Sequence, residues 1–116
     1  MLKFPGAVRV YFCVEATDMR KSFDGLSGMV ANIIRQSPVS GHLFVFRNKR
    51  GNCIKLLYWD GDGFAIWYKR LEQGTFSIPK ISEDGTIEPR DLSMMLEGVD
   101  FAKIRRKKRY KIGSNN

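Results

Sequence analysis

The pattern of hydrophobic and polar residues changes along this chain, and its first part predicts a strand followed by a helix. Residues 7–14 form a nearly continuous apolar run rich in β-branched and aromatic side chains, which predicts a central strand buried on both faces. Thr17 and Asp18 follow, and either can cap a helix. Apolar residues then recur at intervals of three and four: Met19, Phe23, Leu26, Val30 and Ile33. This spacing predicts an amphipathic helix that ends at about Gln36.

From residue 42 the period changes to two, the spacing of a β-strand. Four segments are expected to be strands: residues 42–47, 53–59, 64–71 and 75–78. Polar turns connect them, and the Asp-Gly pairs at 60–63 supply the positive φ that a tight hairpin needs. The pattern therefore predicts an antiparallel β-meander.

The last part of the chain predicts a short helix and a tail. A loop or small hairpin around the Asp-Gly pair at 84–85 is expected first, then a helix over residues 90–97 that Gly98 ends. The whole pattern predicts an α+β fold, in which an N-terminal strand and an amphipathic helix pack on the meander. We expect one domain over residues 1–102 and a basic tail over residues 103–116.

Length and composition fit a folded domain. The 116 residues include 43% hydrophobic and 12% aromatic side chains, which is enough for one core and too many for a disordered chain. No apolar run approaches the roughly 20 residues of a membrane-spanning helix, and the N-terminus lacks the apolar segment of a signal peptide. A cytoplasmic protein with no membrane partner is therefore expected.

Net charge is +8, from 20 basic and 12 acidic residues, and nearly all of the excess lies at one end of the chain. Residues 1–102 hold 13 basic and 12 acidic side chains, whereas the remainder holds seven basic ones and no acidic one. The seven are Lys103, Arg105, Arg106, Lys107, Lys108, Arg109 and Lys111. Such a tail favours a polyanion, most often nucleic acid, over the alternative of a terminus that only increases solubility.

A second basic cluster occupies the first turn of the expected meander. Arg47, Lys49 and Arg50 lie there with no acidic neighbour. Three cations on one protrusion suit a phosphate backbone or a groove, although a solvated turn has the same composition. With the tail, these three are the candidate nucleic-acid-binding residues.

Aromatic residues crowd the second and third expected strands of the meander. The candidates for stacking on bases, or for a protein interface, are Tyr58, Trp59, Trp67 and Tyr68. Three basic residues are interleaved with them, as a nucleic-acid platform requires: Lys55, Lys69 and Arg70. Packing of the same rings in the core beneath the helix is the alternative.

No set of residues in the sequence supports catalysis or a metal site. The turn at 60–63 lacks the remaining ligands of a calcium loop, and His42 is the only histidine. Cys13 and Cys53 lie in apolar strands and are expected to fill the core. We therefore expect a non-enzymatic protein with no catalytic residue, no cofactor and no metal.

Five blocks of sequence, in order and at matching spacing, resemble a known protein family. They are TDMRKSFDGL at 17–26, SGHLFVFR at 40–47, IKLLYWDGDGF at 54–64, WYKRLE at 67–72 and LEGVD at 96–100. The family is that of the TnpB-type accessory proteins, encoded by the second open reading frame of elements of insertion-sequence family 66. The chain departs from the family pattern at Phe101, where Trp is common, and in the number of lysines in its tail.

This resemblance implies a bacterial, cytoplasmic protein that assists transposition, while a separately encoded DDE transposase cuts the DNA. Combined with the basic clusters, it leads us to expect a non-catalytic, DNA-binding accessory factor of DNA recombination. Its expected partners are DNA, in particular the element ends, and the transposase. The alternatives, in order, are a protein–protein adaptor without direct DNA contact, an RNA-binding module and a metal-dependent nuclease.

Overall fold

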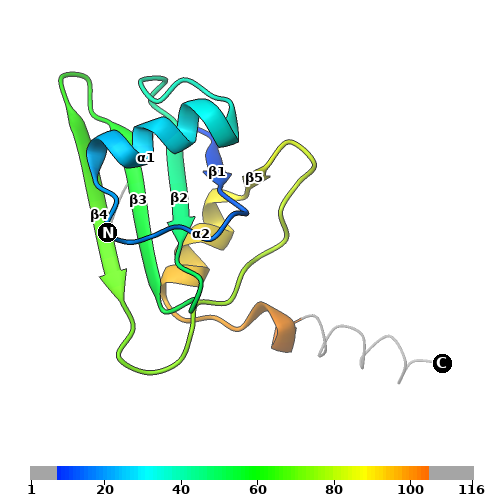
Figure 1. The fold of residues 1–116 in the computed structure, drawn as a ribbon. Coiled ribbons are helices and arrows are strands. Elements are labelled where there is room, and N and C mark those ends of the chain that lie inside the picture. The colour runs from blue at the N-terminus through cyan, green and yellow to red at the C-terminus, as the bar shows by residue number, and fades with distance from the viewer. Residues whose placement is uncertain (1–7, 105–116) are drawn as a thin grey trace.

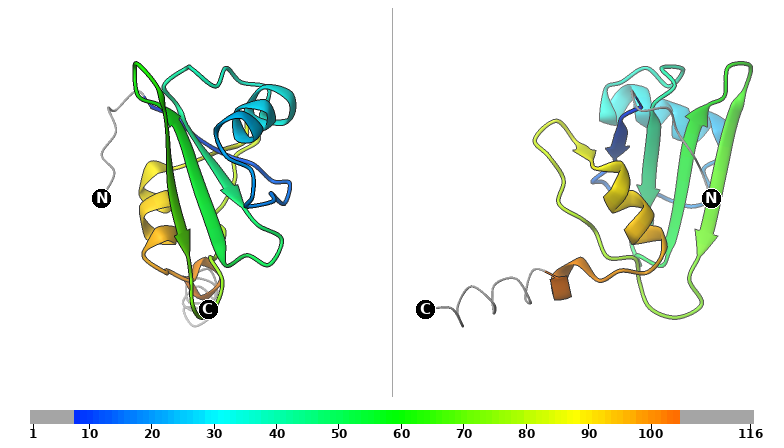
Figure 2. Two further views of the ribbon diagram at one scale, coloured as in Figure 1. Left: turned by 60° about the vertical axis from the view of Figure 1, so that its left-hand side comes forward. Right: turned by 180° about the vertical axis from the view of Figure 1, so that it is seen from behind.

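The computed structural model describes residues 8–104, which form a mixed β-sheet with helices on both faces (Figure 1; Figure 2). The strands are β1 (Val10–Phe12), β2 (Leu43–Arg47), β3 (Cys53–Trp59), β4 (Phe64–Arg70) and β5 (Thr86–Ile87). The helices are α1 (Phe23–Met29), which continues as the π-helix η1 (Val30–Ile34), and α2 (Pro89–Leu96). The expected α+β class is confirmed.

The sheet has the strand order β4-β3-β2-β1-β5, and only part of it is a meander. β2, β3 and β4 pair antiparallel in chain order, as the alternation of residues predicted. β1 pairs parallel to β2, with Val10 opposite Leu43, because α1 carries the chain back to the end of the sheet where β1 began. β5 pairs antiparallel with the other side of β1. The predicted central position of the first strand is confirmed, since all three residues of β1 are buried.

Two hydrophobic cores cover the two faces of the sheet, and α1 and α2 lie on opposite faces (Figure 2). The α1-side core consists of Tyr11, Cys13, Leu26, Met29, Val30, Phe44, Phe46 and Leu57. The α2-side core consists of Val10, Phe12, Leu43, Val45, Ile54, Leu56, Phe76, Ile87, Leu92, Met95, Leu96 and Phe101. Burial on both faces explains the nearly continuous apolar character of β1 and β2.

The first helix begins later than predicted. It starts at Phe23, with Ser22 at the N-cap position, whereas Thr17 and Asp18 lie in the preceding loop. The Asp18 carboxylate accepts a hydrogen bond from the backbone N–H of Arg20 at 2.9 Å and so shapes that loop. The predicted cap was wrong because an aspartate stabilises a turn and a helix N-terminus through the same kind of local hydrogen bond.

The buried stripe of this helix is narrower than the spacing of its apolar residues predicted. Leu26 and Val30 are fully buried, but Phe23 and Ile33 are 45% and 40% exposed. In η1, Ile33 is exposed while Ile34 packs on the α1-side core, and Arg35 ends the helix in the left-handed conformation with φ 63°. A π-helical turn leaves no mark in the hydrophobic pattern.

Residues 75–78 do not form the predicted fourth strand of the meander. The chain leaves β4 and crosses to the α2 face, where Phe76 is 1% exposed in the core. The backbone N–H of Phe76 donates to the carbonyl oxygen of Gly51 at 2.8 Å instead of pairing with β4. The prediction was wrong because burial of the Phe76 ring directs this segment to the face of the sheet rather than to its edge.

The segments around α2 match the sequence pattern. A hairpin turn precedes β5, with the backbone N–H of Ser82 donating to the carbonyl oxygen of Thr86 at 2.8 Å. α2 buries Leu92, Met95 and Leu96, and Gly98 follows it with φ 88°. None of the helices within residues 8–104 has the length and apolar character needed to cross a membrane.

Candidate nucleic-acid interface

The turn between β2 and β3 is a rigid protrusion that carries two free cations. The Asn48 side-chain oxygen accepts from the backbone N–H groups of Gly51 and Cys53 at 2.9 and 3.0 Å. Lys49 and Arg50, between them, are exposed and make no ion pair with another described residue. The asparagine thus fixes the turn and leaves both cations in solvent.

Arg47, the third basic residue predicted for this turn, points inward. Its guanidinium donates to the carbonyl oxygen of Phe76 at 3.0 Å, and its Nε atom is buried without a hydrogen-bond partner among residues 8–104. Gly51 has φ +83° and lies directly over this guanidinium, where a Cβ atom would overlap it. Arg47 therefore holds residues 75–77 against the hairpin, and Lys49 and Arg50 are the cations that the turn presents.

The C-terminal part of the described chain lies at the same end of the sheet as this turn. Phe76 bonds to Gly51 as described above, and the backbone N–H of Phe101 donates to Ser77 Oγ at 3.1 Å. Lys103, two residues further on, is exposed. Figure 1 shows the β2–β3 turn and the segment over residues 98–104 together at the lower end of the sheet. We call Lys49, Arg50 and Lys103 the basic end.

The loop over residues 15–22 carries two exposed cations and is joined to the turn that carries Lys49 and Arg50. The backbone N–H of Thr17 donates to the carbonyl oxygen of Arg47 at 2.9 Å, which holds this loop against the turn. An open hollow of about 460 Å³ separates the two segments. Arg20 and Lys21 are exposed on this loop. The sequence pattern did not single them out, because it assigned both to the first turn of a helix, which in the structure begins only at Phe23.

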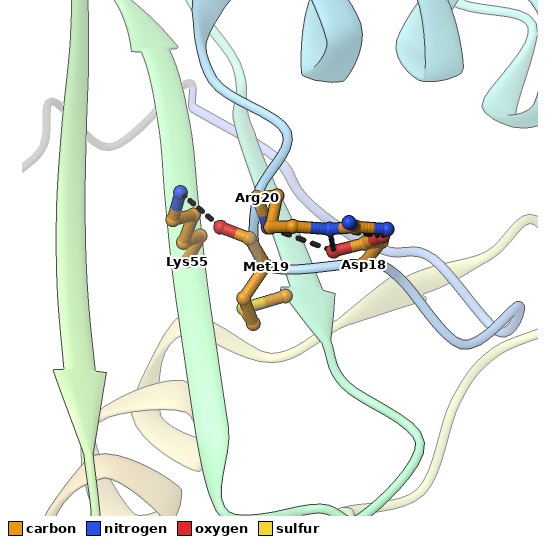
Figure 3. Close-up of polar contacts among 4 residues, drawn as sticks. All are labelled: Asp18, Met19, Arg20 and Lys55. Carbon is orange, nitrogen blue, oxygen red and sulfur yellow. Dashed lines mark hydrogen bonds and ion pairs between the residues drawn. The ribbon is translucent and has the colours of Figure 1, made fainter.

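Arg20 is partly neutralised by its neighbour (Figure 3). Its guanidinium binds the Asp18 carboxylate through two nitrogens, the shorter distance being 2.6 Å to Oδ2. This hydrogen bonding lowers the pKa of the Asp18 carboxyl group from 3.8 to about 2. Asp18 therefore stays ionised near neutral pH, so Arg20 adds less to the positive potential than Lys21 does.

The three basic residues interleaved with the aromatic side chains all have partners within the molecule. The Lys55 ammonium group is buried and donates to the carbonyl oxygen of Met19 at 2.8 Å (Figure 3) and to that of Lys21, also at 2.8 Å. Lys69 Nζ donates to the carbonyl oxygen of Leu96 at 3.0 Å, at the C-terminal end of α2 where a cation is favoured. Arg70 pairs with Glu72 at 3.1 Å.

The four candidate stacking residues are divided between the two faces of the sheet. Tyr58 and Trp67 are partly buried against the α2-side core. Trp59 makes an edge-to-face contact with Phe64 at 5.0 Å between ring centroids, and Phe64 packs on the α1-side core. Tyr68 is 51% exposed on the α1 side of β4. No single surface holds all four rings, because neighbouring residues of a strand point to opposite faces.

The residues weighed for catalysis or metal binding have structural roles. His42 Nδ1 accepts from the backbone N–H of Arg9 at 3.0 Å. Cys13 and Cys53 are buried, as expected, and burial raises the pKa of the Cys13 thiol. The turn at 60–63 closes with the Asp60 N–H donating to the Gly63 carbonyl oxygen at 2.8 Å. Within residues 8–104, no three acidic, histidine or cysteine side chains are placed to share a metal ion.

The remaining basic residues of the predicted tail lie outside the described residues: Arg105, Arg106, Lys107, Lys108, Arg109 and Lys111. They follow directly after residue 104, and so continue the chain from the basic end.

Comparison with known proteins identifies one family along most of the chain. The model of a family described as "IS66 Orf2 like protein" matches residues 8–106. Two relatives come from Sinorhizobium fredii (strain NBRC 101917 / NGR234). The uncharacterized protein y4jC is 32% identical over 102 residues, which cover 86% of each chain. The uncharacterized protein y4hO is 38% identical over 96 residues, 81% of this chain and 83% of its own. No solved structure matches.

Proposed function

Because the chain belongs to the family of IS66 Orf2-like proteins, which associates it with an insertion-sequence element, we propose that it is a non-catalytic accessory factor of transposition that binds DNA through its basic end and tail. The tail supplies affinity for phosphates that does not depend on sequence, and Lys49 and Arg50 position the protein on the duplex. The separately encoded transposase carries out the chemical steps, and the protein acts beside it in the cytoplasm.

One observation carries this proposal: the exposed turn and the start of the tail lie at the same end of the sheet. Two hydrogen bonds link them through residues 76 and 77, as described above. Residues 1–102 are nearly neutral overall, and Asp100 is exposed close to Lys103, so most of the excess positive charge lies in the tail. A DNA duplex that contacts the turn is therefore within reach of the first residues of the tail.

DNA binding is tested by fluorescence anisotropy at several salt concentrations, on duplexes with element ends and on scrambled duplexes. If about five tail cations each neutralise one phosphate, replacing residues 105–109 by Gln reduces the log–log salt slope by about 4.5. The double variant Lys49→Gln/Arg50→Gln reduces it by about 1.8, again at about 0.9 per phosphate. Tighter binding to the element-end duplexes than to the scrambled ones would show that the folded part recognises DNA sequence.

A matched control replaces two exposed cations at the opposite end of the sheet, Arg9→Gln/Arg90→Gln. This variant has the same net charge as Lys49→Gln/Arg50→Gln, and we expect its salt slope to equal that of the parent. If both double variants reduce the salt slope equally, an interface at the basic end is contradicted. Absence of binding by the parent protein to either duplex contradicts the DNA-binding function.

A second candidate function, an adaptor that binds the transposase, is favoured by an exposed apolar site. Val14 and Ile33 are 76% and 40% exposed and line a hollow of about 320 Å³ between η1 and the turn before β5. Exposed apolar groups that meet at a hollow are typical of protein interfaces. In this case Val14→Ser/Ile33→Ser abolishes co-purification with the transposase, whereas the Gln variants of the tail do not affect it.

A further inference from the structure

The two edges of the sheet differ in how they are protected. β5, at one edge, has two residues and is followed closely by Pro89, so it offers little backbone for pairing. β4, at the other edge, has seven residues, contains no proline and pairs with β3 alone. No strand within residues 8–104 pairs with its outer side. A long edge strand of this kind is a template for another strand.

The hydrogen-bonding groups on the outer side of β4 follow from its pairing with β3. The hairpin closes at Asp60 and Gly63, and the Leu71 N–H donates to the Asn52 carbonyl oxygen at 2.8 Å. Because hydrogen-bonded and non-hydrogen-bonded pairs alternate in an antiparallel ladder, every second residue of β4 directs its N–H and C=O outward. Those residues are Phe64, Ile66, Tyr68 and Arg70.

Charge is distributed along β4 as a dipole. Asp60 and Asp62 are exposed in the turn that precedes the strand, whereas Lys69, Arg70 and Glu72 lie at its other end, where Glu72 pairs with Arg70 and one positive charge remains in excess. A second β4 placed antiparallel brings Arg70 of each strand beside the acidic turn of the other. A parallel arrangement would place like charges side by side, which is unfavourable. The charge pattern therefore favours a second copy of this chain in antiparallel orientation.

We infer that two copies of the protein associate through their β4 strands, forming a continuous antiparallel sheet with Trp67 on the two-fold axis. In this register Phe64 pairs with Arg70 of the other copy and Ile66 pairs with its Tyr68, so that every outward-facing residue is hydrogen-bonded. Arg70 lies beside an aromatic ring and within reach of Asp62 of the other copy. This surface differs from the basic end and does not depend on DNA binding.

The oligomeric state of the full chain is the first test, measured by light scattering after size-exclusion chromatography. We expect a mass of twice 13.3 kDa, falling to the monomer mass on dilution. Arg70→Glu places a carboxylate beside Asp62 of the other copy and weakens the dimer at least about tenfold. Adding Asp62→Arg to that variant restores the opposite charges and the dimer. Both positions are exposed, so neither change disturbs the core.

Cross-linking tests the register. Ala65 of one copy lies opposite Lys69 of the other in a non-hydrogen-bonded pair, where Cα atoms are about 4.5 Å apart and a disulfide fits. A mixture of Ala65→Cys and Lys69→Cys proteins forms a disulfide-linked dimer on mild oxidation, whereas each variant alone, like the parent, forms none. A parent protein that is monomeric at all concentrations, or a dimer unaffected by Arg70→Glu, overturns the inference. Cross-linking by either variant alone overturns the register.

Discussion

Lys55 and Tyr68 form a cross-strand pair between β3 and β4 in which the ammonium nitrogen lies 4.8 Å from the centre of the aromatic ring. The same ammonium group donates to the carbonyl oxygens of Met19 and Lys21, so a single buried cation joins the sheet to the loop before α1. The loop that carries Arg20 and Lys21 is thereby held against the sheet. A lysine that resembles a surface cation in the sequence is thus a structural element.

Lys55→Met tests this link. Methionine preserves the apolar stem of the side chain but removes two charge-assisted hydrogen bonds and the contact with the Tyr68 ring. We expect the free energy of unfolding in urea to fall by about 1–3 kcal/mol. Lys80→Met, at an exposed position, is the control and should change it by no more than about 0.5 kcal/mol. Equal stability of the two variants would show that the buried cation does not stabilise the fold.

Gly51→Ala should destabilise the protein more than Gly61→Ala does. Both glycines have φ +83°, so the backbone cost of about 1–2 kcal/mol is common to both. A Cβ at Gly51 overlaps the Arg47 guanidinium, whereas one at Gly61 meets no atom within 4 Å. The additional loss for Gly51→Ala is expected to be about 1–3 kcal/mol, measured by urea denaturation. Similar losses at the two sites would contradict the inward position of Arg47.

Phe76 and Phe23 should respond very differently to replacement by alanine. Phe76 is 1% exposed in the α2-side core, and its truncation is expected to lower the free energy of unfolding by about 3–5 kcal/mol. Phe23 is 45% exposed at the start of α1, and we expect a loss below about 1 kcal/mol. The comparison uses the midpoints of urea denaturation. A larger decrease in the free energy of unfolding for Phe23→Ala would support the sequence prediction that Phe23 lies on the buried face of the helix.

The Asp18–Arg20 pair gives a prediction for acidic pH. The Arg20 guanidinium holds the pKa of the Asp18 carboxyl group at about 2, below the unfolded-state value of 3.8. Because the folded-state pKa is the lower one, the stabilisation is present above pH 3.8 and is lost as the pH falls through about 2. In Arg20→Gln the pKa of Asp18 should rise toward 3.8, as followed by NMR of the carboxyl carbon. An unchanged value would assign the shift to the loop backbone instead.

Local patterns in the sequence were enough to predict the local elements of the fold. The three strands of the meander, α2 and the Asp-Gly turns all depend on residues within a few positions of one another. The parallel pairing of β1 with β2 and the position of β5 beside β1 join residues far apart in sequence. No periodicity encodes such pairing, and the sheet was therefore predicted as a meander rather than a mixed sheet.

The sequence showed which basic residues cluster in the candidate interface, but not which of their side chains face solvent. Lys49 and Arg50 were found as a basic turn, and the structure exposes both. Arg47, of the same residue type in the same cluster, turns inward because the Phe76 carbonyl and Gly51 accommodate its guanidinium. Arg20 was overlooked because it was assigned to the first turn of a helix that begins at Phe23. For Arg47, a contact between segments 29 residues apart decides the direction of the side chain.

The position of β5 beside β1 also sets the order in which the molecule is completed as it emerges from the ribosome. β1 is synthesised before β5, so its outer edge stays unpaired until residues 86–87 have been synthesised. The sheet face that α2 covers stays open even longer, because Leu92, Met95 and Leu96 close it. A nascent chain that has completed β4 at residue 70 therefore still exposes the apolar face that α2 later covers, and an exposed apolar sheet of this kind favours aggregation.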